Sequence, residues 1–431
     1  MAVKYKKRIA DEIIDFKLAT KGAVLIEGAK WCGKTTTAEQ HAKSCIYMSD
    51  PAVNDQNMSL AALNPQQLLK GKTPRLIDEW QSAPTLWDAV RFEVDHRGEF
   101  GQFLLTGSAV PPETAAIHHT GTGRFSWLRM RPMALCESGE STGEVSLKSL
   151  FDGTVTPQTL SAMNQLNLKT MAYLICRGGW PQAVRLEGRA ALSQAYDYVD
   201  AVARLDVARV LNQKVSDKNE NRLRLLLRSY ARYQGSQTAL TAIQEDLKIN
   251  SSEELHRETL SKYIDALKQI FVIEDMPAWN PNLRSKTAVR TTDTRYFVDP
   301  SIAAAALRIG PQDLLNDLPT CGFLFETLCV RDLRVIADAL DGNVYHFRDK
   351  NDRECDAVVH LRDGRYGLIE VKLGGPKLIN EGASNLLKIA ANLDTAKMKA
   401  PSFLMVLTAV GQYAYYRNDN VLVVPIGCLG L

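Results

Sequence analysis

The sequence has no Cys-x-x-Cys pair, no cysteines spaced with histidines as zinc ligands are, and no long apolar run. Its eight cysteines are therefore expected to be buried thiols in a reducing compartment rather than disulfides or zinc ligands. A membrane span needs about twenty apolar residues, and the N-terminal residues lack the continuous apolar core of a signal peptide. These absences predict a cytoplasmic protein without a membrane segment.

An excess of charge of one sign is also missing, because 52 basic residues nearly balance 49 acidic ones and leave a net charge of +3. Such a balance predicts no partner by itself, so any nucleic-acid contact must come from local basic patches. The 431 residues have room for about three domains, each able to bury its own core. The hydrophobic content of 45% and the charged content of 23% are ordinary for a soluble globular protein.

A glycine-rich stretch near the start organises the chain. An apolar run leads into GAKWCGKTT, which fits the G-x-x-x-x-G-K-T pattern of a phosphate-binding loop. The glycines let backbone N–H groups point at one polyphosphate, to which Lys34 is predicted to reach, while the Thr35 hydroxyl binds Mg²⁺. The alternative, a glycine-rich turn before a structural helix, is disfavoured by the motifs downstream. The predicted nucleotide-binding residues are Gly28, Ala29, Lys30, Trp31, Cys32, Gly33, Lys34, Thr35 and Thr36.

Two later apolar stretches end in polar residues. RLIDE predicts a strand whose Asp78 holds Mg²⁺ and whose Glu79 polarises the attacking water, and a merely solvated strand end is the alternative. QFLLTGS predicts another strand, and in AAA-type ATPases a polar residue at this point, called sensor 1, lies beside the γ-phosphate. Thr106 is the first candidate for that position and Ser108 the second, and a Thr-Gly-Ser turn without a ligand is the alternative.

Together with two further short apolar runs, these strands predict a parallel sheet over residues 1–136, with ATP at the carboxyl ends of the strands. Arg124, before the fifth strand, is a candidate arginine finger, although a plain surface arginine is the commoner outcome. A loop is expected at Glu137–Gly143, and residues 137–235 are expected to form a helical lid or linker, with helix across Ala190–Leu211.

Residues 236–299 are expected to form a winged-helix-like domain. Two short amphipathic helices, Ala239–Leu247 and Thr259–Ile270, precede two strand-like segments, and the connection between those segments carries Arg284, Lys286 and Arg290. The presumed recognition helix carries only two lysines, so nucleic-acid binding and protein binding both stay open.

The last predicted domain covers residues 300–431 and contains a hairpin, ECDAVVHL-RDG-RYGLIEVKL. A three-residue loop, Arg362–Gly364, with its glycine in the left-handed conformation would place Asp356 opposite Glu370, with Lys372 on the same face. A two-residue loop would instead place Asp356 on the other face of the hairpin.

An acid before a hairpin and E-x-K on the return strand form the PD-(D/E)XK nuclease arrangement. Asp356 and Glu370 would bind Mg²⁺ through oxygen, and Lys372 would orient or deprotonate the attacking water. Glu326, on a helix predicted at Phe323–Leu340, could add an outer carboxylate. The alternatives are an amphipathic hairpin with solvated charges and a nuclease fold that has lost its activity.

With these motifs the chain resembles, nearly end to end, the prokaryotic AAA-type ATP-binding proteins that carry a C-terminal domain of unknown function, the four-one-four-three family. The stretches that carry the resemblance are GAKWCGKTTT, LIDEW, LLTGSA, GRFSWLRMRPMALCE, RGGWPQAV, TRYFVDPSIAAAAL and YHFRDKNDRECDAVVHLRDGRYGLIEVKLG. The resemblance implies an α/β chain with an AAA-type core, a winged-helix-like middle and a restriction-endonuclease-like end. Two departures stand out, because Lys30-Trp31 replaces the common paired arginines and Ala109 replaces a second serine, which favours Thr106 or Ser108 as the sensor.

Two functions follow from this organisation. The first is an ATP-dependent nuclease or DNA-processing enzyme, and the intact Asp356, Glu370 and Lys372 favour it. The second is an ATP-driven switch whose C-terminal domain only binds nucleic acid or protein, and the weak overall charge favours it. The expected cofactors are ATP and Mg²⁺. DNA is the favoured partner, a protein partner and an oligomer stay open, and no membrane is expected.

Overall fold

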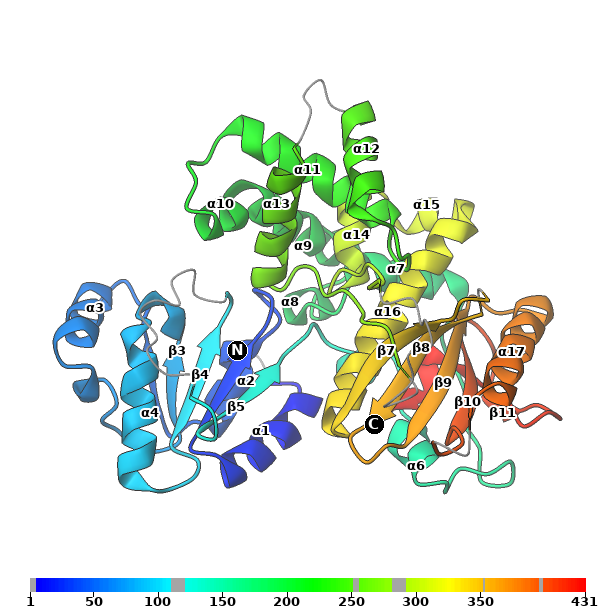
Figure 1. Ribbon diagram of the computed structural model, residues 1–431, viewed down its shortest axis with the longest axis horizontal. Coiled ribbons are helices and arrows are strands. Elements are labelled where there is room, and N and C mark those ends of the chain that lie inside the picture. Colours follow the sequence, from blue (N-terminus) through cyan, green and yellow to red (C-terminus); the bar gives the residue numbers. More distant parts are fainter. Residues whose placement is uncertain (1–4, 110–120, 251–255, 281–291, 352, 395–397) are drawn as a thin grey trace. The chain divides into compact units, whose positions relative to one another are not determined.

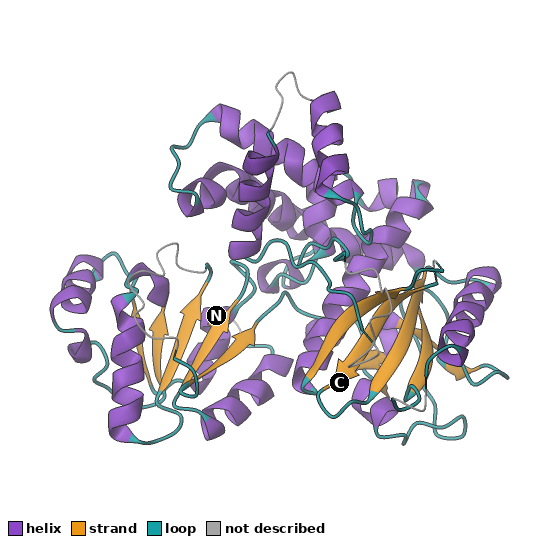
Figure 2. Ribbon diagram, viewed as in Figure 1, coloured by secondary structure: helices purple, strands orange, loops and turns teal. Residues whose placement is uncertain are grey.

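The computed structural model describes residues 5–109, 121–250, 256–280, 292–351, 353–394 and 398–431. The chain divides into two compact units, Met1–Pro132 with Ala266–Phe271, and Met133–Asp265 with Val272–Leu431. The first unit holds a parallel sheet, and the second holds a helical region and a mixed sheet (Figures 1 and 2). The predicted α/β class is therefore confirmed. Among the described residues, no helix is both long enough and apolar enough to span a membrane.

The sheet of the first unit has five strands in the order β2-β3-β4-β1-β5, and each neighbouring pair is parallel. Their bounds are β1 Ala23–Glu27, β2 Ser44–Tyr47, β3 Arg75–Asp78, β4 Phe103–Gly107 and β5 Phe125–Arg129. Strand β4 lies between β1 and β3. Because parallel strands end at the same edge of a sheet, the segments that follow β1, β3 and β4 meet there.

Helices and short turns complete this unit. They are α1 Ile9–Thr20, α2 Lys34–His41, α3 Asn54–Leu63, η1 Pro65–Gln67, η2 Trp80–Ser82 and α4 Thr85–Arg97. The apolar run of β1 is buried because both faces of the sheet are covered, as expected for parallel strands. In the core, the ring of Trp87 stacks on Phe125 with 4.0 Å between ring centroids.

The second unit begins with a helical region. Its elements are α5 Leu135–Ser138, β6 Val145–Ser146, α6 Leu147–Phe151, α7 Leu168–Arg177, α8 Pro181–Val184, α9 Gly188–Ala201, η4 Val202–Asp206, α10 Val207–Val210, α11 Asp217–Arg232, α12 Leu240–Asn250, α14 Pro300–Leu307 and α15 Pro311–Asn316. Helix α13, Arg257–Gln269, begins in this unit, and its residues from Ala266 on belong to the first unit. The loop predicted at Glu137–Gly143 starts later than expected, because Glu137 accepts a hydrogen bond from the Ala134 backbone and α5 continues to Ser138.

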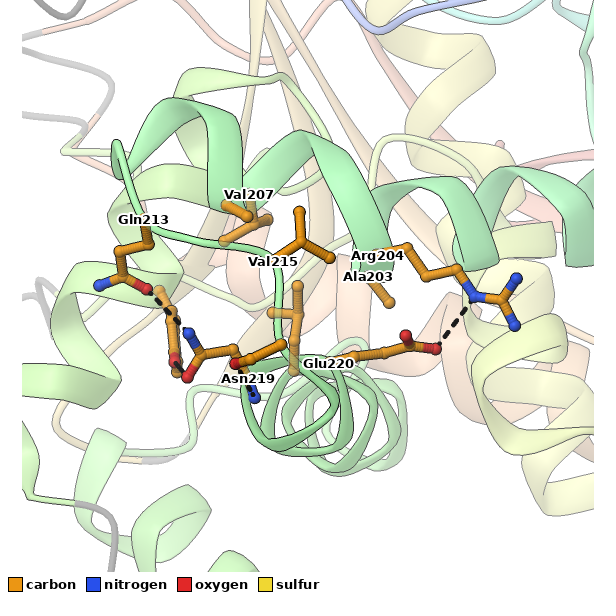
Figure 3. Close-up of a pocket in the computed structure, with 11 residues that line it drawn as sticks. Ala203, Arg204, Val207, Gln213, Val215, Asn219 and Glu220 are labelled. Atoms are coloured by element: carbon orange, nitrogen blue, oxygen red, sulfur yellow. Dashed lines mark hydrogen bonds and ion pairs between the residues drawn. The ribbon is translucent and has the colours of Figure 1, made fainter.

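The helix predicted across Ala190–Leu211 is interrupted by one π-helical turn, η4. Figure 3 shows a small hollow beside this turn, where Arg204 forms an ion pair with Glu220 at 3.1 Å. The hollow measures about 10 Å³, which is room for about one water molecule. We therefore assign no ligand to it.

The two helices expected in the winged-helix-like region are present as α12 and α13. The expected hairpin after them is reduced, in the described residues, to isolated antiparallel bridges between Ile273 and Phe297 and between Met276 and Thr294. Ala278 forms a further bridge to His346 of the next sheet. Arg284, Lys286 and Arg290 lie outside the described residues.

The mixed sheet has six strands in the order β11-β12-β10-β9-β8-β7. Strands β7, β8 and β9 are antiparallel neighbours, while β9, β10 and β12 are parallel. Helix α16 packs along β7, β8 and β9, and α17 packs along β8, β9 and β10. The bounds are α16 Leu318–Ala339, β7 Gly342–Arg348, β8 Glu354–Leu361, β9 Tyr366–Lys372, α17 Pro376–Ala391, β10 Phe403–Thr408, β11 Tyr415–Tyr416, β12 Leu422–Pro425, η5 Ile426–Cys428 and β13 Leu429–Gly430.

The hairpin between β8 and β9 has the predicted loop. Leu361 donates its backbone N–H to Arg365 at 2.8 Å, and Gly364 is left-handed with φ 84°. The register pairs Ala357 with Ile369, so the next position in each strand sets Asp356 against Glu370. The three-residue loop is confirmed, and it puts both acids on one face.

Candidate functional site

The loop between β1 and α2 is shaped by two left-handed glycines. Gly28 has φ 152° and Gly33 has φ 102°. A Cβ on Gly28 would lie 2.0 Å from the carbonyl oxygen of Met130, so no other residue fits there. Gly33 is the N-cap of α2, which directs the free N–H groups of that helix toward the loop.

The side chain of Lys34 lies inside this loop. Its ammonium donates hydrogen bonds to the carbonyl oxygens of Gly28 at 2.9 Å and Ala29 at 2.8 Å, and the residue is only 6% exposed. These two bonds hold a positive charge inside the loop.

Three of the predicted side chains meet beside this loop. Oδ1 of Asp78 accepts hydrogen bonds from the hydroxyl of Thr35 at 2.7 Å and from the hydroxyl of Thr106 at 2.6 Å. These residues come from the start of α2 and from the ends of β3 and β4, which the strand order places next to each other. Asp78 and Thr106 are both buried.

Glu79 follows Asp78 in a left-handed backbone conformation with φ 56°. Its Oε2 accepts hydrogen bonds from Nε2 of Gln81 and from the hydroxyl of Ser108, the latter at 3.3 Å. The second sensor candidate therefore contacts the second acid, while the first candidate contacts the first acid.

The other predicted loop residues differ in exposure. Ala29 and Cys32 are fully buried, and the thiol of Cys32 donates to the carbonyl of Met130 at 3.4 Å. Trp31 is 52% exposed, Lys30 is half-buried and Thr36 is exposed. Because the side chains of Ala29 and Cys32 are buried, these two residues can offer a ligand only their backbone groups.

A second cluster lies at the hairpin of the mixed sheet. The ammonium of Lys372 bridges Oδ2 of Asp356 at 3.2 Å and Oε2 of Glu370 at 2.6 Å. The backbone N–H of Val371 donates to Asp356 at 2.7 Å, and the amide of Asn385 donates to Glu370 at 2.7 Å. The predicted convergence of the two acids and the lysine is therefore present.

Glu326 approaches this cluster from α16 and accepts a hydrogen bond from the hydroxyl of Tyr296. Burial and the nearby charge of Asp356 raise the pKa of Glu326 well above its ordinary value. Burial and the same charge also raise the pKa of Glu370, against the opposing effect of Lys372. Within the described part of the chain, no three His, Cys, Asp or Glu side chains are arranged to hold a metal ion.

Beside this cluster a cleft of about 650 Å³ opens between α16 and the end of β9. Glu326 and Lys372 are its only charged lining residues among those described, and most of the remaining surface is apolar. The lining side chains from Leu318, Phe323 and Leu378 are partly exposed.

Models of known protein families match most of the chain. Residues 20–138 match the model of an AAA domain, and residues 321–429 match a domain of unknown function, DUF4143. The chain therefore carries an AAA domain near its N-terminus and a DUF4143 domain near its C-terminus. Residues 168–313 match another domain of unknown function, DUF8612.

Curated relatives of this chain include the uncharacterized proteins Mb2031c of Mycobacterium bovis and Rv2008c of Mycobacterium tuberculosis. Each is 22% identical over 404 residues, which cover 93% of this chain and 79% of the relative. Among solved structures, the Walker-type ATPase PABY2304 of Pyrococcus abyssi is similar over 71% of this chain and 96% of its own, with 13% identity and a TM-score of 0.41.

Within the AAA domain, the structure disfavours Arg124 as a finger for this chain's own loop. Its backbone carbonyl accepts a hydrogen bond from Ala23, at the amino ends of the strands and so at the opposite edge of the sheet from Gly28. Its side chain forms an exposed ion pair with Asp95 at 2.7 Å. The parallel direction of β5 beside β1 fixes this edge.

Arg8 is a residue of the AAA domain that the sequence did not point to. Its guanidinium donates to the carbonyl of Cys32 in the loop at 3.0 Å and to the carbonyl of Arg131 at 2.9 Å, and it is 5% exposed. Gln81 is another such residue. Arg8 acts through a contact that is distant in sequence, and Gln81 acts through a contact within a turn. Neither kind of contact leaves a spacing pattern in the sequence.

Proposed function

We propose that the AAA domain binds ATP with Mg²⁺ and hydrolyses it. The observation that carries this proposal is the convergence of Lys34, Thr35, Asp78, Glu79 and Thr106 at the carboxyl edge of one parallel sheet. In the proposed reaction, Lys34 leaves its two loop carbonyls and pairs with the phosphates, and Glu79 accepts a proton from the attacking water. Thr106 holds Asp78 in place.

The oxygen donors of this site fit Mg²⁺. The hydroxyl of Thr35 and the carboxylate of Asp78 already lie 2.7 Å apart, and hydroxyl, carboxylate and phosphate oxygens are the ligands that Mg²⁺ prefers. These two residues would hold the ion, which when bound neutralises charge on the phosphates. Parallel measurements of ATP binding and phosphate release on the full chain test this proposal.

Arg8→Ala is expected to raise the KM for ATP roughly 3- to 30-fold, because it removes a charged hydrogen bond that fixes the loop backbone at Cys32. Steady-state phosphate release at varied ATP concentrations measures the effect. Lys7→Ala is the matched control, since the neighbouring Lys7 forms an exposed ion pair with Glu12. A lower melting temperature with an unchanged KM would make Arg8 a structural anchor alone.

For the DUF4143 domain we propose a metal-dependent site that acts on nucleic acid, with DNA favoured, coupled to ATP turnover. The observation in favour is the placement of Asp356, Glu370 and Lys372 on one face by the hairpin register. A cation would have to displace Lys372 from the two carboxylates. In the alternative proposal, the domain is an inactive module that binds nucleic acid or protein, which its apolar cleft favours.

Mn²⁺ at about 100 times its Kd should raise the melting temperature of the wild-type chain by several degrees, because binding at that excess stabilises the folded state by about 2.7 kcal/mol. The Asp356→Ala, Glu370→Ala variant should lose this shift and keep its ATPase activity. Asp363→Ala, Glu381→Ala is the control, since it removes two exposed acids of the same domain. Equal shifts in all three proteins would place the metal elsewhere, and binding without cleavage of any nucleic acid tested would favour the inactive module.

A further inference from the structure

The turn that follows Glu79 places the side-chain amide of Gln81 against the Glu79 carboxylate. Trp80 is buried, with its ring 5.1 Å from that of Trp87, and so anchors the short helix η2 in the core. Gln81, the next residue, then donates its Nε2 to Oε2 of Glu79, to which Ser108 also donates. The other carboxylate oxygen, Oε1, accepts no hydrogen bond from any residue that the structure describes.

The orientation of the Gln81 amide follows from its partner. An ionised carboxylate can only accept hydrogen bonds, so the NH₂ group must face Glu79 and the amide oxygen must face away. That oxygen is buried without a hydrogen-bond partner among the described residues. It lies against Gly107, where a Cβ would come within 2.9 Å of it. A buried acceptor without a partner is unfavourable and rare in folded proteins.

Two energetically unfavourable features therefore lie beside the carboxylate of Glu79. Glu79 has a left-handed backbone, which is uncommon for residues other than glycine, and Gln81 leaves its buried oxygen unpaired. Both features place Oε2 of Glu79 against two donors and leave Oε1 available. Strain of this kind persists where the surrounding structure holds it, and it concentrates at functional sites.

We propose that Gln81 is a positioning residue for ATP hydrolysis, which holds Oε2 of Glu79 so that Oε1 takes the proton of the attacking water. This inference rests on the proposed ATPase function. In the step, the water oxygen bonds to the γ-phosphorus and the bond to the β–γ bridging oxygen breaks, with its electron pair leaving on ADP. The water proton passes to Oε1, from which it is released to solvent.

The two donors to Oε2 of Glu79 differ in distance. The geometry makes Gln81 the stronger donor, because Ser108 lies at 3.3 Å, near the long end of a hydrogen bond. Gln81 should therefore matter more than Ser108.

The test is a comparison of Gln81→Ala, Gln81→Glu and Ser108→Ala in the full chain, with ATP affinity, kcat and KM measured for each. We expect Gln81→Ala and Gln81→Glu to lower kcat roughly 10- to 100-fold, with KM within about threefold of wild type. Ser108→Ala should lower kcat less. The glutamate side chain has the shape of glutamine but no donor when ionised, so a residue that only fills space would tolerate Gln81→Glu better than Gln81→Ala.

The pH profile adds a readout that packing alone would not change. For Gln81→Glu, kcat relative to wild type should recover as the pH is lowered, because the introduced carboxyl becomes a donor when protonated. A kcat within twofold of wild type in both Gln81 variants would overturn this inference. The proposed ATPase function would still stand, because the wild-type chain hydrolyses ATP in that outcome. Absence of turnover in the wild-type chain would overturn both. Should Gln81→Ala fail to fold, Gln81→Glu decides by the same criteria.

Discussion

Lys34→Ala is expected to weaken ATP binding by about 100-fold or more and to remove measurable hydrolysis. The ammonium is held inside the loop by two carbonyl oxygens, and each charged hydrogen bond that it would make to phosphate is worth about 1.5–3 kcal/mol. A loss of 1.4 kcal/mol is tenfold in affinity, so two such bonds account for the expected effect. Isothermal calorimetry with ATP and Mg²⁺ measures it.

The same substitution should leave the fold intact. Lys34 is more buried than its place at a loop–helix junction suggested, because its ammonium bonds the carbonyls of Gly28 and Ala29. Those carbonyls lie in the loop, where water can replace the ammonium, so we expect only a small loss of melting temperature. Lys43→Ala, which removes an exposed lysine just beyond α2, is the matched control and should bind ATP as wild type does. Wild-type affinity in Lys34→Ala would contradict the assigned role.

Glu79→Gln is expected to keep ATP bound and to lower kcat by about 100-fold or more, the size of effect typical for loss of a general base. The amide has the shape of the carboxylate, and its oxygen can still accept from Gln81 and Ser108, so the turn should hold. It cannot take up a proton. A fall in kcat with ATP affinity within about threefold of wild type therefore separates chemistry from binding.

Glu12→Gln is the matched control, since Glu12 is an exposed helix residue that pairs with Lys7 at 3.0 Å. Exposed pairs of this kind contribute about 0–1 kcal/mol, so the control should hydrolyse ATP at the wild-type rate. Hydrolysis by Glu79→Gln near the wild-type rate would rule out Glu79 as the base.

The sequence predicted the local features of the candidate sites well. Gly364 follows Arg-Asp in a hairpin pattern, and that chemistry fixes the loop length and hence the face of Asp356. The strands that end at Asp78 and Thr106 were likewise evident as apolar runs that stop at polar residues. Such features depend on neighbours in sequence, which a pattern records.

Features that depend on strand pairing or on contacts distant in sequence could not be predicted. Arg124 looked available as a finger until the strand direction placed it at the edge of the sheet opposite Gly28. Arg8 reaches the loop through a contact 24 positions away along the chain. The expected wing strands form only isolated bridges in the described residues, and a further bridge joins Ala278 to His346 of the mixed sheet.

The electrostatic state of the second cluster also depends on tertiary packing. From the sequence, Asp356 and Glu370 were two carboxylates ready for a cation. In the structure, Lys372 already pairs with one oxygen of each carboxylate, and Asn385 donates to the other oxygen of Glu370. Glu326 adds a third acid whose pKa is raised by burial. Spacing along the chain cannot show which partner a carboxylate takes.

ATP hydrolysis by the AAA domain is tested most directly by phosphate release from ATP and Mg²⁺, with ATP binding measured on the same preparations of wild type, Lys34→Ala and Glu79→Gln. We expect wild type to bind and hydrolyse ATP, Glu79→Gln to bind without turnover, and Lys34→Ala to do neither. No ATP binding by the folded wild-type chain, or equal hydrolysis by all three proteins, would contradict an ATPase site built on these residues.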